Sequence, residues 1–381
     1  MKVTLTDLGF VCALGNNKEV IARNAASGEV PGVCVVSDDV PNRTIPFFQV
    51  LDLNSKYMRC YDLLDRAVEQ INDSIIQLKN KYSSSELGIV LGCSNTGIHE
   101  AQLDIMEWLK TGNCPQEFSF DKIELGSPAI YLQKKLDISG PAYVVSTACS
   151  SSAKAFQTAR NLIKNKVCKA VIVGGVDSRC MFAHNGFYGL SALSDNVTNP
   201  FSANRTGITL GEGAALFIMQ ENVPGIQLLG IGETTDAYDL TSPDPTGNGA
   251  FKSMQQALSE AELDMKDINY INMHGTGTEA NDAMEGTAIN NLFGNSTLCA
   301  STKQLTGHTL GASGAIEIAL SWLMIKNNFI IPHKFDGVYD DRIPKINLAT
   351  GKENIKINNI LSNSFAFGGS NVSVILGDAN D

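Results

Sequence analysis

The chain has 381 residues, of which 43% are hydrophobic and 18% are charged, and its formal net charge at pH 7 is -11. This composition allows a large buried core and excludes an intrinsically disordered chain. The acidic balance argues against general nucleic-acid binding, because a polyanion would need a local basic patch.

The first residues, MKVTLTDLGFVCALG, do not follow the pattern of a signal peptide, and no apolar run is long enough to predict a membrane span. Nine cysteines are scattered along the chain without CxxC spacing. Neither a disulfide framework nor a zinc site fits that scatter, so we expect no metal site and a reducing, cytoplasmic setting.

Short apolar runs alternate with longer segments of helical period, which predicts an α/β fold whose sheets are covered by helices. The predicted strands are Leu87–Leu91, Ala142–Ser146, Ala170–Val173, Ala214–Met219, Ile226–Ile231, Tyr270–Met273, Leu298–Ala300, Asn359–Asn363 and Val372–Leu376. The predicted helices are Met58–Leu78, Ser151–Asn165, Ala250–Ala261, Asp282–Leu292 and Ala312–Lys326. The polar turn ENVPG at 221–225 is the best candidate for a domain boundary, and it divides the chain into residues 1–224 and 225–381.

A cysteine lies where one strand gives way to a helix, in the stretch VVSTACSSSAKAFQTA. Cys149 follows a buried strand and precedes a helix, so unpaired backbone N–H groups and the helix dipole are expected to lower the pKa of its thiol. The same N–H groups are suited to bind an oxyanion. A buried structural cysteine is the alternative, and this segment alone leaves the two interpretations about equal.

Two histidines occupy matching positions in the second part of the chain. His274 follows an apolar strand in NMHGTGTEANDAMEG, and His308 follows Lys303 in STKQLTGHTLGASGA. Loops at strand ends are where α/β proteins collect catalytic groups. No phosphate-binding glycine motif and no zinc-ligand spacing accompanies these histidines, so a nucleotide or metal site is disfavoured.

Together these motifs resemble those of the elongating β-ketoacyl-acyl carrier protein synthases. The motifs are STACSS at 146–151, HGTGT at 274–278, KQLTGHTLGASGA at 303–315 and NSFAFGGSN at 363–371. The opening segment and NPFSANRTGITLGEGAA at 199–215 also resemble that family, so the likeness covers nearly the whole chain.

The resemblance implies a thiolase fold, in which two similar α/β halves form a five-layer α-β-α-β-α core. It implies decarboxylative Claisen condensation of malonyl-acyl carrier protein with an acyl chain held as a thioester on Cys149, elongating a fatty acid, polyene or polyketide chain. Substrates would arrive on the phosphopantetheine arm of the carrier, with no tightly bound cofactor. A homodimer, or a heterodimer with a chain-length-factor-like subunit, is also implied.

The resemblance further assigns roles to the site residues. The Nε2–H groups of His274 and His308 would stabilise the enolate formed on decarboxylation, and Lys303 would assist electrostatically. Lys303 is expected to pair with Glu285, a supporting residue that orders the Gly-Thr loop. Asp282 is expected to cap a loop rather than to act as a base.

The resemblance places an oxyanion hole at the backbone N–H groups of Cys149 and Phe367. Phe365, Ala366 and Phe367 would gate the acyl pocket. Ala366 departs from the glycine common in the family, and its Cβ is expected to stiffen the gate by restricting positive φ.

Ser202 departs from a common aspartate, and the segment 96–127 is short for the family. These departures suggest a specialised synthase, for instance one of the aryl polyene type. The carrier is acidic in this family, so docking needs a positive rim, for which Lys56, Arg59 and Arg66 are the candidates. A solvated helix face is an equally good interpretation of these three residues.

Two other functions remain open at this point. A scaffold of the chain-length-factor type would bind a partner without turnover, although such subunits usually lack the cysteine. A thiolase-like acyltransferase would use coenzyme A esters, but a thiolase needs a second catalytic cysteine, which this chain lacks in a suitable loop.

Overall fold

The computed structural model describes residues 3–53 and 57–378, and the nine predicted strands are all present. The strands are β1 (Val3–Cys12), β2 (Val33–Val36), β3 (Ile45–Phe48), β4 (Leu87–Gly92), β5 (Ala142–Val145), β6 (Ala170–Asp177), β7 (Gly213–Glu221), β8 (Ile226–Thr235), β9 (Tyr270–Met273), β10 (Leu298–Ser301), β11 (Asn347–Leu348), β12 (Asn359–Phe365) and β13 (Ser370–Asp378).

The five predicted helices are also present, and five further α-helices accompany them in the described ranges. The helices are α1 (Lys18–Ser27), α2 (Arg59–Lys81), α3 (Ile98–Thr111), α4 (Ser127–Leu136), α5 (Ser151–Lys164), α6 (Met181–Gly189), α7 (Asn248–Ala261), α8 (Glu279–Phe293), α9 (Lys303–Thr306) and α10 (Ser313–Asn327).

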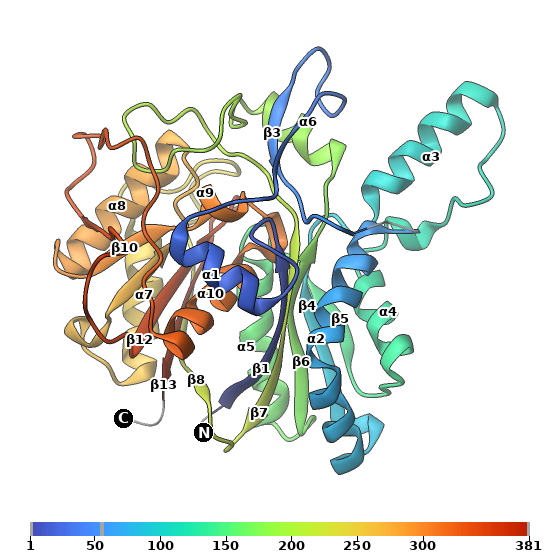
Figure 1. Cartoon of the computed structure of the whole chain (residues 1–381), viewed down its shortest axis with the longest axis horizontal. Helices are drawn as coiled ribbons and strands as arrows, with labels where there is room; N and C mark the ends of the chain where they lie inside the picture. The colour runs from blue at the N-terminus through green and yellow to red at the C-terminus, as the bar shows by residue number, and fades with distance from the viewer. Residues whose placement is uncertain (1–2, 54–56, 379–381) are drawn as a thin grey trace.

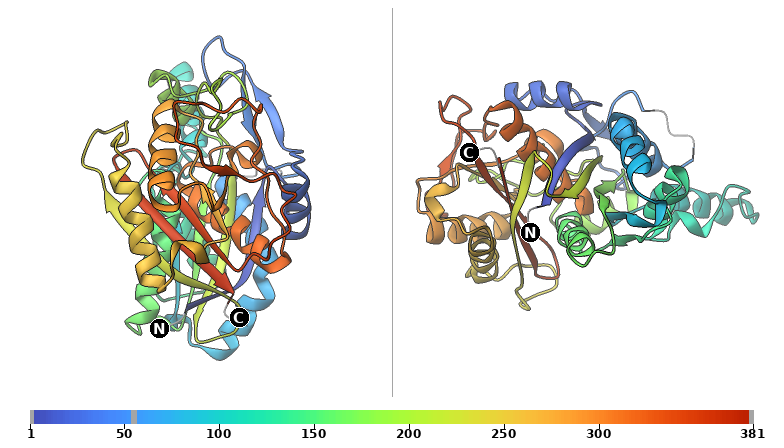
Figure 2. Two further views of the ribbon diagram at one scale, coloured as in Figure 1. Left: turned by 90° about the vertical axis from the view of Figure 1, so that its left-hand side faces the viewer. Right: turned by 90° about the horizontal axis from the view of Figure 1, so that it is seen from below.

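Two sets of five strands follow the same order and direction. In β5-β4-β6-β7-β1 the first three strands are parallel and the last two pairings are antiparallel, and β10-β9-β12-β13-β8 repeats this pattern. The two sets join where β1 pairs with β8 through only Val3, Leu5 and the residue between them. The repeat confirms the expectation of two similar halves (Figures 1 and 2). The boundary at residue 224 remains a prediction.

Three apolar clusters define the layers around these sheets. Helices α2 and α4 cover the outer face of the first sheet, and α7 and α8 cover the outer face of the second. Helices α5 and α10 lie between the sheets and contribute to the central cluster. Strand β6 illustrates the alternation, since Ala170 and Ile172 face the outer cluster while Val171 and Val173 face the central one. The expected α-β-α-β-α layering is therefore confirmed.

Small residues bring the start of α5 close to the strands and to α10. A Cβ atom added to Gly92, the last residue of β4, would lie 2.1 Å from the backbone nitrogen of Ser152. A Cβ atom added to Gly314 in α10 would lie 2.8 Å from Cβ of Ala153. These glycines fix the position of the helix that follows Cys149.

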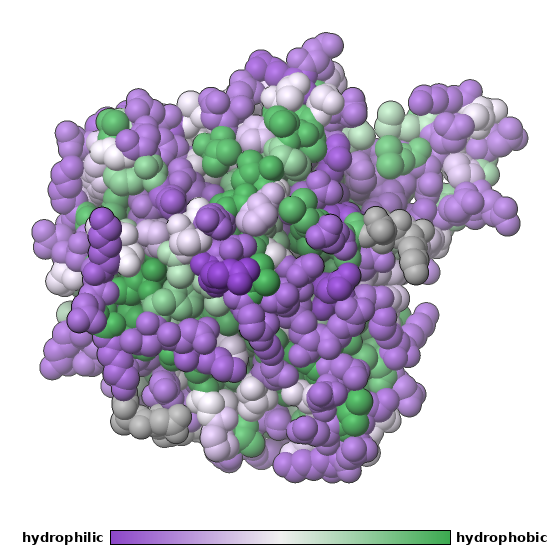
Figure 3. All heavy atoms as spheres, viewed as in Figure 1, coloured by the Kyte–Doolittle hydropathy of each residue, from purple (hydrophilic) through white to green (hydrophobic). Residues whose placement is uncertain are grey.

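Helix α3 and the chain after it project from the body of the molecule (Figure 1). Several large apolar side chains of this arm are exposed, although the face of the arm in Figure 3 shows only a few green spheres among purple ones. They are Leu103, Ile105, Met106, Trp108, Leu109, Phe120 and Ile123. In the two described ranges, no helix is long and apolar enough to cross a membrane.

The Gly92→Ala variant is expected to be destabilised by about 1–3 kcal/mol, because its Cβ atom would overpack the start of α5. Gly126→Ala is the matched control, since a Cβ atom there meets no atom within 4 Å. Thermal melting of both variants checks this prediction. Equal melting temperatures for the two variants would show that the contact at Gly92 relaxes without cost.

Candidate active site

Cys149 lies in a sharp turn between β5 and α5. Ala148 has a φ of 52°, a left-handed conformation that is uncommon for a residue with a Cβ atom. The Ser151 hydroxyl accepts from the Thr147 backbone N–H at 2.8 Å, and the Ser150 hydroxyl donates to the Thr147 carbonyl at 2.8 Å. The serines after Cys149 thus hold the turn that presents the thiol.

His274 follows β9 and is fixed by a carboxylate on α8. The backbone N–H groups of His274 and Gly275 donate to the two oxygens of Glu285 at 2.8 and 2.7 Å. Asn363 also donates to Glu285, at 3.2 Å. Burial raises the pKa of Glu285 to about 7. Glu285 therefore orders the loop that carries His274, as expected.

His308 lies just after α9 and is held through its backbone. Its N–H donates to the Thr209 carbonyl at 2.7 Å, and its carbonyl accepts from the Gly211 N–H at 3.1 Å. Gly307, with a φ of 66°, provides the left-handed turn that precedes it. This connection ties the histidine to the segment 199–215.

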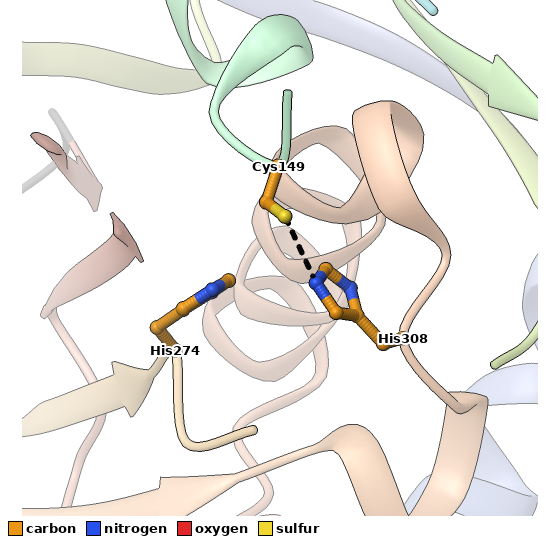
Figure 4. A group of neighbouring side chains, drawn as sticks. All are labelled: Cys149, His274 and His308. Atoms are coloured by element: carbon orange, nitrogen blue, oxygen red, sulfur yellow. Dashed lines mark hydrogen bonds between the residues drawn. The ribbon is translucent and has the colours of Figure 1, made fainter. Parts of the chain in front are cut away.

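The side chains of Cys149, His274 and His308 converge from three separate loops (Figure 4). Their ligand-type atoms lie within 4.8 Å of one another, and Nε2 of His308 is 3.1 Å from the Cys149 sulfur. The two imidazole rings stand nearly perpendicular, with centroids 5.4 Å apart. The sequence-predicted group is thus brought together, while the individual roles remain predictions.

Lys303 is buried beside this group. Its ammonium donates to the His274 carbonyl at 2.7 Å and to His274 Nδ1 at 3.4 Å. Because an ammonium group can only donate, Nδ1 is the acceptor and the proton of neutral His274 sits on Nε2. This tautomer carries the Nε2–H group that His274 is expected to donate to the enolate.

The expected ion pair between Lys303 and Glu285 is wrong. Lys303 instead pairs with Glu317 on α10, which is also buried. Sequence reasoning missed Glu317, although a single carboxylate inside the otherwise apolar helix GAIEIALSWLMI is a recognisable signal. Glu285 is occupied by the backbone of the His274 loop and cannot serve both groups.

Both histidines are neutral at physiological pH. Burial, together with the Lys303 ammonium, holds the pKa of His274 and of His308 well below the ordinary range. The same ammonium makes the site unfavourable for a metal cation, although a thiol and two imidazoles are suitable ligand types.

The expected lowering of the Cys149 pKa is wrong. Burial raises the pKa of this thiol to about 11, while Lys303 and the backbone N–H of Phe367 oppose the rise. The backbone N–H of Cys149 also lowers this pKa. Burial outweighs these contributions, since Cys149 is only 6% exposed. The resting residue is a neutral thiol.

Two cavities meet at Cys149. The first, of about 360 Å³, is lined by Cys149, both histidines, Thr276, Thr278 and Phe367, among others. The second, of about 240 Å³, is mainly apolar and shares Cys149, Phe187, Leu190 and Phe367 with the first. Phe365 and Ala366 also line the first cavity. Phe367 thus borders both spaces.

The departures from the family pattern have local explanations. Ala366 has a negative φ, so its Cβ atom causes no strain, and the left-handed positions fall on Gly368 and Gly369 instead. The expectation that this Cβ atom stiffens the gate by restricting positive φ remains a prediction. Ser202 donates to the carboxylate of Asp336 at 2.9 Å, which supplies an acidic group from another segment.

The candidate docking residues lie in different environments. Arg59 is wrong as a docking residue, because its guanidinium binds the buried Glu212 at 2.5 Å and the carbonyls of Val50 and Leu53. The Arg66 side chain is 39% exposed and lies 3.7 Å from Glu69. Lys56 lies outside the described residues.

Asp282 accepts from the backbone N–H groups of Phe201 and Gly277, a loop-capping arrangement.

Comparison with known proteins places these features in one family. Residues 46–223 match the family described as "Beta-ketoacyl synthase, N-terminal domain", and residues 226–334 match "Beta-ketoacyl synthase, C-terminal domain". The chain is 28% identical to 3-oxoacyl-[acyl-carrier-protein] synthase 1 of Haemophilus influenzae, over 98% of both chains.

Solved structures are similar over the whole length. A chain of "Ketosynthase (ApeO) in Complex with its Chain Length Factor (ApeC)" from Xenorhabdus doucetiae has a TM-score of 0.96 and 35% identity, covering 99% of this chain and 98% of that one. A β-ketoacyl synthase from Burkholderia phymatum has a TM-score of 0.87 and 26% identity, with full coverage of both chains. The expected thiolase fold is thereby confirmed, and the chain belongs to the β-ketoacyl synthase family of acyltransferases.

Proposed function

We propose that this chain is the catalytic subunit of an elongating ketosynthase that condenses malonyl-acyl carrier protein with an acyl chain held on Cys149. The observation that carries the proposal is the convergence of Cys149, His274 and His308, with Nε2 of His308 3.1 Å from the sulfur. A scaffold subunit has no use for this group, and a thiolase-like reaction lacks its second cysteine in the site.

In the first half-reaction, the Cys149 sulfur attacks the carbonyl carbon of the acyl thioester. His308 is placed to take the thiol proton through Nε2. The backbone N–H groups of Cys149 and Phe367, which lower the pKa of the thiol, form the oxyanion hole. The bond between the acyl carbon and the carrier sulfur breaks, the carrier sulfur takes the proton from His308, and the carrier leaves as its thiol.

In the second half-reaction, malonyl thioester loses carbon dioxide and an enolate forms. Once Cys149 is acylated, the neutral His308 ring, whose Nδ1 has no hydrogen-bond partner among the described residues, carries its proton on Nε2, and the Nε2–H groups of both histidines stabilise the enolate oxygen. The enolate carbon attacks the acyl carbonyl, the Cys149 thioester bond breaks, and the sulfur takes up a proton from solvent. The product is a β-ketoacyl chain on the carrier. Lys303 acts through the histidines, since it fixes the tautomer of His274 and, together with burial, keeps both rings neutral.

The two cavities indicate where the carrier arm binds, where the acyl chain binds and which residues form the gate. The first cavity receives the phosphopantetheine arm of the carrier, because it contains both histidines and the Thr276 and Thr278 positions. The second, apolar cavity receives the acyl chain. Phe367 lines both cavities, with its ring centroid 5.7 Å from that of Phe187, and with Phe365 and Ala366 it forms the gate.

A specialised, polyene-type substrate and a second subunit are part of this proposal. The likeness to the ketosynthase solved with its chain length factor supports a heterodimer of that kind, with a homodimer as the alternative. The exposed apolar residues of the arm that carries α3 supply a surface for such a partner. The nine cysteines are free thiols, which supports a cytoplasmic location.

Intact mass after mixing with acyl-carrier thioesters tests the covalent step. The wild-type protein is expected to gain one acyl group, and Cys149→Ala is expected to gain none.

His274→Ala and His308→Ala are expected to lose condensation about 100-fold or more, because each removes an N–H donor to the enolate. Normal condensation by both histidine variants would refute the assigned roles.

Alkylation with iodoacetamide checks the protonation state of the nucleophile. Because the pKa of Cys149 is about 11, the thiolate fraction rises about tenfold for each pH unit below that value. Labelling of Cys149 is therefore expected to accelerate by about this factor per unit between pH 7 and pH 9. Cys149→Ala reports background labelling of exposed Cys114. A rate independent of pH in this interval would contradict the buried neutral thiol.

Removal of the Lys303 charge is expected to move the acidic limb of malonyl decarboxylation to higher pH. Without the ammonium, the pKa of both histidines rises toward the ordinary value, so they become protonated at a higher pH than in the wild type. The variant Lys303→Met with Glu317→Gln avoids an unpaired buried carboxylate. Lys303→Arg keeps the charge and serves as control. An unmoved limb in the double variant would show that Lys303 does not control these pKa values.

A further inference from the structure

Helix α6 forms one wall of the apolar cavity beside Cys149, and this wall is made of apolar side chains that the rest of the chain leaves open. The residues of the helix and its end that line the cavity are Phe182, Ala183, Gly186, Phe187 and Leu190. Phe182 is 65% exposed and Leu190 is 50% exposed. The opposite face carries His184, which is completely buried. Helix α6 is therefore the reverse of an ordinary surface helix, whose apolar face is buried.

A single residue, Asp39, holds the buried face of α6. Asp39 lies between β2 and β3 and is only 1% exposed. Its carboxylate is 2.9 Å from Nδ1 of His184, and it accepts from Nε and Nη2 of Arg179 at 2.9 and 2.5 Å. Its backbone carbonyl accepts from the Asn185 side chain at 2.5 Å. Arg179 precedes α6 and the other two residues lie within it, so Asp39 contacts both the start and the middle of the helix.

The carboxyl group of Asp39 is ionised in this environment. Burial alone would raise its pKa, but hydrogen bonds from His184 and Arg179 hold the pKa well below the usual range. Nδ1 of His184 also lies 3.2 Å from the Cys180 carbonyl. Because both neighbours are acceptors, Nδ1 carries a proton and donates it. The imidazole ring packs against Phe47 of β3, with centroids 5.5 Å apart, which fixes α6 beside this strand (Figure 1).

We propose that Asp39 is a positioning residue that determines which lengths of acyl chain the enzyme accepts. It acts through α6, because a helix held in place offers a fixed apolar wall to a chain bound to Cys149. A long chain gains contact area along this wall, whereas an acetyl group has a single methyl group beyond its carbonyl and gains little. The inference rests on the proposed function, which places the acyl chain in this cavity.

The test compares acetyl and octanoyl donors on the carrier, with kcat/KM for acylation of Cys149 measured by intact mass. Asp39→Asn keeps the size of the side chain and removes its charge. The ratio of the octanoyl value to the acetyl value is expected to fall about tenfold, the effect of about two methylene groups that no longer pack against α6. Asn185→Ala removes one contact and leaves the ion pair, so it is expected to lower the ratio less. This second variant keeps the test decisive if Asp39→Asn does not fold.

Asp7→Asn is the matched control. Asp7 accepts from Lys18 at 2.9 Å and from Ser74 at 2.6 Å, and it is not among the residues that line either cavity. The control variant loses the same charge and is expected to keep the wild-type ratio. Thermal melting of both variants separates a general loss of stability, which lowers both donor rates alike, from the expected change in the ratio.

Gly186→Leu tests the wall itself. A Cβ atom at this position meets no atom within 4 Å, so a leucine fits there and is expected to lower the ratio by filling part of the cavity. A lower ratio in Gly186→Leu with an unchanged ratio in Asp39→Asn and Asn185→Ala would overturn this inference alone. An unchanged ratio in Gly186→Leu would show that the chain does not lie along α6, which overturns the inference and the location assigned to the acyl chain. Failure of every donor to acylate the wild-type protein would overturn the proposed function as well.

Discussion

The close packing of α5 against α10 between the two sheets is the constraint on which the site depends. Cys149 lies at the start of one of these helices, and His308, Lys303 and Glu317 lie before or within the other. Gly314 and Ala153 let the two helices approach, so groups 159 residues apart in sequence come within hydrogen-bond distance. The first set of strands positions Cys149, and the second positions His274. Because both sets have the same strand order, the loops that carry these residues meet.

The electrostatics of the site follow from its burial. A thiol and two imidazoles in a dry environment favour their neutral forms, and a single ammonium held by Glu317 reinforces this for the histidines. Neutral imidazoles donate N–H groups without introducing charge before the enolate appears. Burial also leaves the Cys149 thiol protonated. The thiol must therefore lose its proton during the reaction, and the adjacent His308 can receive it.

The sequence predicted the regular elements well where the pattern was strong. Apolar runs such as Leu87–Leu91 and the helical period of Ser151–Asn165 identified their strand and helix directly. Strand β1 was missed because its polar residues Thr4, Thr6 and Asp7 interrupt the run and its register shifts between Leu5 and Asp7. Helix α3 was missed because its apolar residues are exposed rather than aligned on a buried face.

The sequence identified the residues of the site, but it did not predict their ion pairing or their protonation states. Cys149, His274 and His308 came from motifs, whereas the partner of Lys303 and the pKa of the thiol depend on burial, which no motif encodes. Arg59 illustrates the same limit. An arginine early on an amphipathic helix resembles a surface residue until the buried Glu212 on a distant loop is known to face it.

The two cavities that share Cys149 and Phe367 have a kinetic consequence. Under the proposed mechanism, the acyl donor and the malonyl donor both use the space of about 360 Å³ beside the histidines, while the transferred chain is stored in the other. The first carrier must therefore depart before the second can enter, and no complex contains both carriers at once. Such an enzyme follows ping-pong kinetics, in which double-reciprocal plots at different concentrations of the second substrate are parallel lines.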